Sequence, residues 1–295
     1  NQLAAPRVRT GERIDDVESY LAEARALPPR QAAAVLADAA LRHGKADWLL
    51  EGADILAAAG EQERALRLLL DTPAGPVGGD LTVQRRAFAL AQESTDAAAL
   101  EATAAALFSR PDLARDERLS VHAAKASALL PIDRRAALAA LGAWLDDEPN
   151  AEAALSALVL PLLDAGQFAP ALARLDAAVR TGGQGAEARR ALLARVAEVA
   201  LKKGEVAVEI RARELLLAEP AEGDPSLGVE LERLADLYGE AGQYRQAVDV
   251  LERRVALGGA SDALAALLLR IAALEEDQLH DKPRAAAALR SHLRH

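Results

Sequence analysis

Five histidines are the residues of this 295-residue chain best suited to acid–base chemistry or metal binding near neutral pH. None of them forms the His-Glu-x-x-His pattern, which places two zinc ligands on one helix face. The last two are three residues apart and would share a helix face, but no third ligand accompanies them in the sequence. We therefore expect no metal site and no cofactor. The five are His43, His122, His280, His292 and His295.

Motifs of nucleophilic and phosphate chemistry are also missing. The chain has no Gly-x-Ser-x-Gly elbow and no cysteine, so neither a serine nor a cysteine nucleophile is indicated. His43-Gly44-Lys45 lacks the earlier glycine that a phosphate-binding loop requires. The acidic run 146–148 is typical of a solvated helix end rather than of a carboxylate pair. The sequence therefore predicts a protein that is not an enzyme.

The charge balance narrows the classes of partner. The formal charge is −10, from 35 basic and 45 acidic residues, and this disfavours binding to nucleic acid or to an anionic membrane. No run of eighteen apolar residues occurs, so no direct membrane insertion is predicted. The chain starts at Asn1 and contains no methionine, from which we expect a fragment of a longer protein. Its compartment stays open: cytoplasm is the default, and periplasm or a membrane anchor would follow if a signal preceded Asn1.

The elements that would position any site are helices, and they repeat. Apolar residues make up 51% of the chain but aromatic residues only 3%, and Ala and Leu, which favour helices, predominate. The stretch "EAGQYRQAVDVLERR" (240–254) closely resembles "DAGQFAPALARLDAA" (164–178). Gly204 lies 38 residues from both Gly166 and Gly242, which predicts a repeat of about 38 residues with a degraded middle copy.

Each repeat has the pattern of two helices joined at the glycine. The residues before the glycine are apolar at steps of three and four, and the glycine is suited to the left-handed end of the first helix. The second helix carries Ala and, four residues later, Leu, as in Ala65/Leu69, Ala137/Leu141, Ala171/Leu175, Ala247/Leu251 and Ala285/Leu289. We expect residues 1–12 to be an N-terminal extension and 13–295 to be a single array. Its eight predicted units lie near 13–43, 46–71, 81–108, 116–146, 151–179, 187–218, 226–256 and 262–295.

These residues resemble the tetratricopeptide repeat family. The unit from Leu231 matches its pattern through Ala235, Tyr238, Ala247 and Leu251, and other units match in part. The resemblance implies an all-α, right-handed superhelix of stacked helix pairs, although other helical solenoids with a looser consensus also fit the residues. Such stacks bury their apolar faces between neighbouring repeats.

The resemblance also implies where a partner would bind. In this family the first helices of successive pairs line a concave groove that holds peptide ligands. The polar residues of the predicted first helices are therefore the candidate binding residues. They are Asp47, Glu51, Asp54, His122, Arg195, Glu198, Lys202, Glu232, Arg233, Asp236, Glu240 and Arg270.

The function that follows is a protein-interaction scaffold without catalysis. Recognition of chaperone tails, for which the family uses Lys, Arg and Asn, is disfavoured because the groove is acidic and both asparagines lie outside it. A protein or peptide partner of basic or mixed charge, or one held by apolar contacts, fits better. Two alternatives remain open: an assembly module that forms homo-oligomers through its faces or ends, and a regulatory fragment of a multidomain protein.

Overall fold

The computed structural model describes residues 14–219 and 226–293, with side chains from residue 19 onward. The predicted extension over residues 1–12 lies outside these residues. The described part of the chain is helical and contains no strand. No helix in it is both long and apolar enough to cross a membrane.

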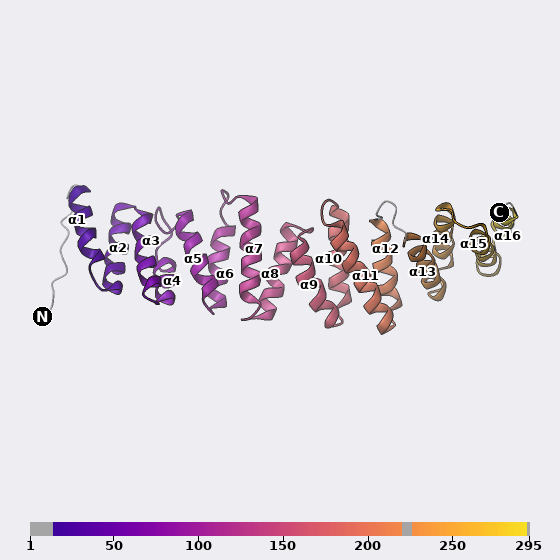
Figure 1. Ribbon diagram of the computed structural model, residues 1–295, viewed down its shortest axis with the longest axis horizontal. Coiled ribbons are helices and arrows are strands. Elements are labelled where there is room, and N and C mark those ends of the chain that lie inside the picture. Colours follow the sequence, from indigo (N-terminus) through magenta and orange to yellow (C-terminus); the bar gives the residue numbers. More distant parts are fainter. Residues whose placement is uncertain (1–13, 220–225, 294–295) are drawn as a thin grey trace. The chain divides into compact units, whose positions relative to one another are not determined.

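Sixteen α-helices and one short π-helix follow one another in the described residues (Figure 1). In chain order they form eight first-helix and second-helix pairs, so the predicted all-α fold of helix pairs is confirmed. The pairs are α1 (Ile14–Arg25) and α2 (Pro29–His43), α3 (Ala46–Ala58) and α4 (Gln62–Leu70), α5 (Leu81–Glu93) and α6 (Ala97–Phe108), α7 (Arg115–Leu129) and α8 (Arg134–Asp147), α9 (Glu152–Asp164) and α10 (Phe168–Thr181), α11 (Ala186–Lys203) and α12 (Val206–Ala218), α13 (Leu227–Glu240) and α14 (Tyr244–Ala256), and α15 (Ser261–Ala273) and α16 (Lys282–His292), with the π-helix η1 (Leu274–Gln278) after α15.

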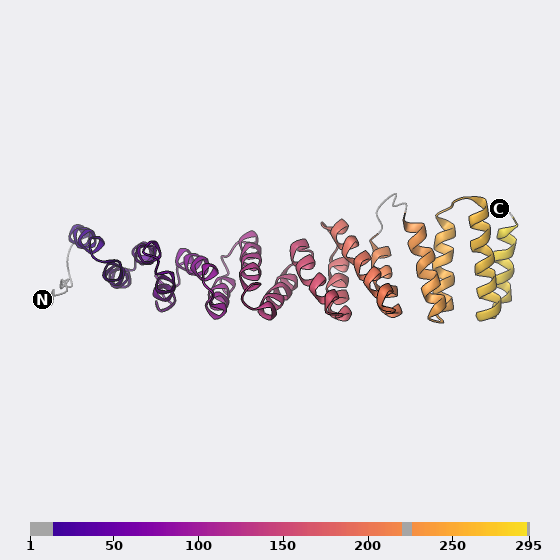
Figure 2. The same cartoon turned by 60° about the horizontal axis from the view of Figure 1, so that its bottom comes forward.

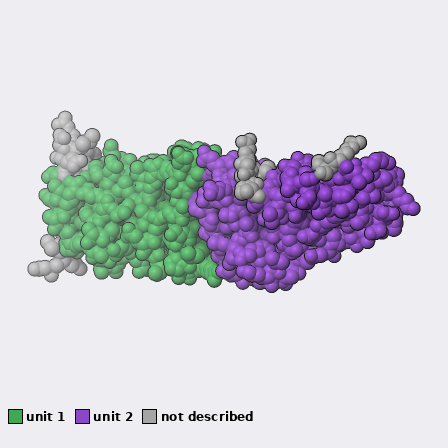
Figure 3. All heavy atoms as spheres, turned by 45° about the vertical axis from the view of Figure 1, so that its right-hand side comes forward, with its two compact units in different colours: residues 1–140 green, residues 141–295 purple. Residues whose placement is uncertain are grey.

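The chain divides into two compact units, residues 1–140 and 141–295, and the division falls within α8 (Figure 3). Consecutive helices pack on one another from α1 to α7 in the first unit and from α9 to α16 in the second, as Figure 2 shows for α13–α14 and α15–α16. First helices also contact the first helix of the next pair, α3 on α5 and α5 on α7 in one unit and α9 on α11 in the other. This nearest-neighbour contact pattern is that of a helical repeat array.

Prolines, glycines and aspartates set where the helices begin and end. α2 begins at Pro29, where the missing N–H costs nothing, and ends before Gly44, which is left-handed with φ 66°. α6 begins after Asp96, whose carboxylate accepts hydrogen bonds from the backbone N–H groups of Ala98 and Ala99 at 2.9 and 3.1 Å. Local sequence thus accounts for the short connections between helices.

The repeated glycine is the corner between the two helices of a pair, as predicted. Gly242 has φ 71°, and Gln243 N–H after it donates to the carbonyl of Tyr238 at 2.8 Å. Gly166 and Gly204 adopt the same left-handed conformation, with φ 70° and 71°. The next position at 38-residue spacing is His280, and its φ is 55° although it is not glycine. The spacing of 38 residues holds only for these later turns, because the first helices α3, α5 and α7 begin 34 or 35 residues apart.

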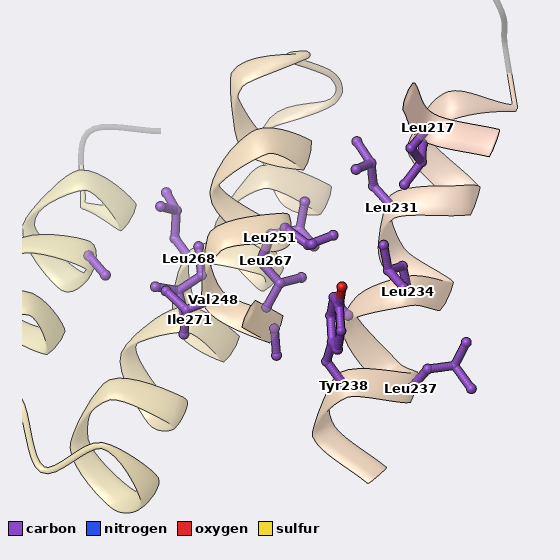
Figure 4. Packing of buried hydrophobic residues seen from close by; sticks show 14 of the residues in the cluster. Leu217, Leu231, Leu234, Leu237, Tyr238, Val248, Leu251, Leu267, Leu268 and Ile271 are labelled. Carbon is purple, nitrogen blue, oxygen red and sulfur yellow. The ribbon is translucent and has the colours of Figure 1, made fainter. Parts of the chain in front are cut away.

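The core of the second unit contains one apolar cluster that runs through several pairs. Figure 4 shows side chains of α12, α13, α14 and α15 meeting in it, among them Leu217, Leu231, Tyr238, Leu251 and Leu267. Fully burying one such leucine contributes about 1.5–3 kcal/mol. The small residues Ala235 and Ala247 are fully buried, which lets α13 and α14 approach closely.

Candidate functional site

The exposed side of α3 forms a shallow hollow in the first unit. Asp47, Leu50, Glu51 and Asp54 line it, because residues three and four apart lie on one side of a helix. Ile55 and Ala58 complete the lining. The predicted candidates Asp47, Glu51 and Asp54 are therefore brought together by the structure, beside half-buried aliphatic side chains.

The opposite side of α3 is held firmly in the core. Leu49, Ala53 and Leu56 are buried there. Gly52 lies so close to α2 that an added Cβ would be 3.1 Å from the carbonyl oxygen of Ala33. The orientation of the hollow is therefore determined by packing on the other side of the helix.

Two of the three carboxylates in the hollow are neutralised by arginines from neighbouring first helices. Glu51 accepts two hydrogen bonds from Arg25 of α1, at 2.5 and 2.8 Å, and this pairing lowers the pKa of the Glu51 carboxyl although burial opposes the shift. Asp54 pairs with Arg86 of α5 at 2.7 Å. Asp47 is exposed. The hollow thus has aliphatic side chains at its base and three carboxylates, of which two pair with arginines and the third, that of Asp47, is exposed.

The α11 candidates pair with one another along their own helix. Glu198 accepts from Arg195 at 2.7 Å and from Lys202 at 2.5 Å, and these cations lower the pKa of its carboxyl, Lys202 most. All three side chains are exposed. Pairs at this spacing stabilise the helix that carries them only slightly.

The α13 candidates join α13 to its neighbours. Asp236 pairs with Arg270 of α15 at 2.6 Å, so these two candidates are brought together. Glu232 pairs with Arg254 of α14 at 2.7 Å. A partner that used either carboxylate would have to compete with an arginine that is already bound.

Arg233 and Glu240 complete the predicted set on α13. Arg233 donates to Glu209 of α12 with two nitrogen–oxygen distances of 3.1 Å, and this hydrogen bonding raises its pKa. Glu209 is buried, so the contact is structural. Glu240 is exposed and lies 3.8 Å from Arg233.

The assignment of His122 to an exposed groove is wrong. Its side chain is only 4% exposed, and its ring stacks on Phe108 of α6 with centroids 4.3 Å apart. The cause is the register of α7, in which Val121, Ala126 and Leu129 are buried and place His122 on the packing side. Polarity alone predicts a surface position for this side chain, whereas the apolar spacing of its own helix predicts a buried one.

The sequence reasoning missed a set of ion pairs between successive first helices. Arg25–Glu51 joins α1 to α3, Asp54–Arg86 joins α3 to α5, and Arg85–Glu117 joins α5 to α7. The later two pairs link residues 32 positions apart, close to one repeat. Opposite charges at the repeat distance are the sequence signal that would have revealed them.

A buried arginine in the second unit was also missed. Arg189 is 1% exposed and donates to Glu219 at 2.5 and 3.0 Å, to the carbonyl of Gln184 at 2.6 Å and to Asn150 at 3.3 Å. It ties the loops before α9 and α11 to the end of α12. Because its donors are occupied, Arg189 holds the fold together and is not a ligand site.

A second hollow lies between α14, α15 and α16. Its walls include Val255, Ile271 and Ala288, and its charged members are paired: the fully buried Glu275 lies 3.3 Å from Arg284. Arg284 also pairs with Glu252 at 3.2 Å. Among the described residues no three His, Cys, Asp or Glu side chains are grouped to bind a metal ion.

Comparison with known proteins gives structural likeness only. No family model and no curated protein matches the sequence. A tetratricopeptide repeat protein from Parabacteroides merdae is 17% identical, with 83% of this chain and 91% of that chain covered and a TM-score of 0.34. The C-terminal part of a TPR repeat-containing protein from Cytophaga hutchinsonii is 15% identical, with coverages of 83% and 94% and a TM-score of 0.31. MamA is 18% identical, covers 55% of this chain and 88% of its own, and has a TM-score of 0.28.

In its repeat motif and its paired helices, the chain is similar to tetratricopeptide repeat proteins.

Proposed function

We propose that this chain is a protein-interaction scaffold that binds a segment of a partner protein on the exposed side of its first helices and performs no catalysis. The observation that carries the proposal is the hollow on α3, where an aliphatic floor lies beside carboxylates. Leu50 and Ile55 offer apolar contact, and Asp47 offers an exposed negative charge. The other candidate carboxylates, on α11 and α13 of the second unit, are bound to cations of the chain itself.

The partner that fits is a peptide segment that places an aliphatic side chain next to a lysine or arginine. The aliphatic group would cover Leu50 and Ile55, and the cation would pair with Asp47. A segment with acidic side chains would meet Asp47, Glu51 and Asp54 and be repelled. This expectation agrees with a partner of basic or mixed charge.

The choice of variants follows from the ion pairs. Reversing Glu232 or Asp236 would leave Arg254 or Arg270 facing a like charge, so lost binding could reflect a disturbed fold. Asp47→Lys avoids this difficulty, because Asp47 is exposed at the start of α3. Asp249→Lys on α14 is a matched control, since Asp249 is also an exposed helical aspartate and lies on a second helix.

The test is selection of a displayed random-peptide library on the 295-residue chain, followed by titration of the enriched peptides. We expect them to share an aliphatic residue beside a basic one. Asp47→Lys should weaken their binding about tenfold or more, as expected for a lost and reversed ion pair, and Asp249→Lys should leave it unchanged. Circular dichroism would verify that both variants keep their helicity. No enrichment, or equal binding by both variants, would refute the proposal.

A further inference from the structure

A tyrosine of the chain fills the place where α12 meets the pair α13–α14. Tyr238 of α13 is 7% exposed, and its hydroxyl donates to the carboxylate of Glu214 on α12 at 2.6 Å. Its side chain belongs to the apolar cluster of this unit, which Figure 4 shows. Aliphatic members of the same cluster are Leu217, Leu231, Leu234 and Val250. This place therefore holds a ring in an aliphatic cluster and a hydroxyl on a carboxylate.

The second hollow lies at the corresponding place one repeat later, where α14 meets the pair α15–α16. Its residues follow their counterparts in the preceding repeat by 37 or 38 positions. The corresponding residues are Glu214 and Glu252, Leu217 and Val255, Leu231 and Leu268, Leu234 and Ile271, Tyr238 and Glu275, and Val250 and Ala288.

The π-helix accounts for the change from 37 to 38 positions. At the corner after α13, the N–H of Gln243 donates to the carbonyl of Tyr238, five residues earlier. At the corner after η1, the N–H of Asp281 donates to the carbonyl of Glu275, six residues earlier, at 2.7 Å. One additional residue is thus accommodated in η1. Glu275 therefore stands in the register of Tyr238.

Smaller side chains at the corresponding positions create the hollow. Glu275 stands in place of a tyrosine, Val255 in place of a leucine and Ala288 in place of a valine. The Glu275 carboxylate is fully buried and is bound by Arg245 of α14 at 3.0 Å. The hollow has a volume of 240 Å³, whereas a cavity of about 150 Å³ lined by aliphatic and aromatic side chains holds benzene. It is therefore large enough for an aromatic ring.

The carboxylate that accepts the tyrosine hydroxyl in the preceding repeat is kept at the hollow. Glu214 accepts from Arg211 at 2.8 Å with one oxygen and from Tyr238 with the other. Glu252 likewise accepts from an arginine, Arg284, at 3.2 Å with one oxygen. Pairing with an arginine is therefore compatible with accepting a phenol hydroxyl.

We propose that the second hollow binds a tyrosine side chain of a partner protein. The ring lies among Val255, Ile271 and Ala288, as the ring of Tyr238 lies in the aliphatic cluster one repeat earlier. The hydroxyl donates to Glu252. A site that accepts a hydroxyl discriminates against the analogue that lacks it, so tyrosine is preferred to phenylalanine. This site lies in the second unit and does not rest on partner binding at α3.

The first test is titration of the isotope-labelled 295-residue chain with N-acetyl-tyrosinamide and N-acetyl-phenylalaninamide, followed by NMR at the amides of Ala287, Ala288 and Ser291. We expect the tyrosine probe to bind about fivefold or more tightly, since the probes differ only in the hydroxyl. Glu252→Ala should abolish this preference and leave the affinity of the phenylalanine probe unchanged. Glu240→Ala is the matched control, because Glu240 is also an exposed glutamate near an arginine and lies outside the hollow. Equal affinities of the two probes for the wild type, or no shift at these amides, would overturn the proposal.

A second variant tests the hollow itself. Ala288→Leu adds a side chain where the ring would lie and should weaken binding of the tyrosine probe about tenfold or more. Ala273→Leu, at an exposed residue of α15 outside the hollow, should not. Circular dichroism would verify that both variants keep their helicity. Unchanged affinity in Ala288→Leu would contradict the proposal, and so would binding of free p-cresol without binding of the tyrosine probe, which would indicate a small phenol as the ligand.

Discussion

Replacing His280 with glycine should stabilise the protein, although it removes a side chain. His280 has φ 55° at the corner where Gly166, Gly204 and Gly242 have φ near 70°. A residue with a Cβ is strained in this left-handed region, whereas glycine is not. The contact that the histidine makes in return is slight, because its Nδ1 lies 3.3 Å from the carbonyl of Glu276 on an exposed surface.

The expected gain in the free energy of unfolding is the difference between two opposing contributions. Relief of left-handed strain contributes about 1–2 kcal/mol. The greater freedom of glycine in the unfolded chain offsets about 0.5–1 kcal/mol of this. A net stabilisation of about 0.5–1 kcal/mol remains, which in a chain of this size raises Tm by about 1–3 °C.

Gly242→Ala provides the reverse experiment at an equivalent corner. An added Cβ at Gly242 would meet no atom within 4 Å, so the substitution reports on backbone strain and not on a clash. We expect it to destabilise the protein by about 1 kcal/mol. His280→Ala, which keeps the strain and removes the imidazole, separates the two contributions of the histidine.

The measurement is urea unfolding followed by circular dichroism, together with hydrogen exchange of α15 and α16. Repeat arrays can unfold in stages, so exchange shows whether the effect is local to the last pair. If His280→Gly were no more stable than His280→Ala, the strain argument for this corner would be refuted.

Two further predictions concern the ion pairs. Arg189→Met should destabilise the second unit by about 3–5 kcal/mol, because the Glu219 carboxylate loses its partner in a largely buried setting. The double variant Arg189→Met/Glu219→Gln should recover part of this loss of stability in urea unfolding. If the stability changes of the two single variants simply added in the double variant, the two side chains would not be directly coupled. Arg25→Gln should reduce stability by at most about 1 kcal/mol, as for a partly exposed pair. Because Arg25 lowers the pKa of Glu51 in the folded state, that stabilisation is present above the ordinary carboxyl pKa and is lost as the pH falls below it. The difference between wild type and Arg25→Gln should therefore disappear in acid, and a difference that persisted at low pH would contradict the assignment.

The fold could be predicted from sequence because its signals are local. Glycine at a corner and the Ala–Leu template each depend on residues within one helix pair, and Gly242, Ala247 and Leu251 behave as their spacing indicates. Phe168 is buried after its Gly-Gln corner, whereas Tyr244 in the same register is only half-buried. The neighbouring helix pairs determine how far each ring is buried, and the repeat template describes only one pair.

The candidate site was less predictable because it depends on contacts between pairs. The hollow on α3 follows from helical periodicity, which sets Asp47, Glu51 and Asp54 on one side of the helix. Whether such a carboxylate can bind a partner depends on whether an arginine of the adjacent helix pair already binds it. The sequence of one helix does not show this contact. His122 is buried because the apolar register of its own helix outweighs the polarity of its side chain.

The ion pairs between first helices also mean that the helix pairs cannot be exchanged freely. Arg25 of α1 faces Glu51, the sixth residue of α3, whereas the sixth residue of α5 is Arg86. Deleting the α3–α4 pair would bring Arg86 to the place of Glu51 and set two arginines against each other. The ion pairs between first helices therefore form only in the native order of helix pairs. An array of the same helix pairs in another order would keep the apolar template but place like charges next to each other.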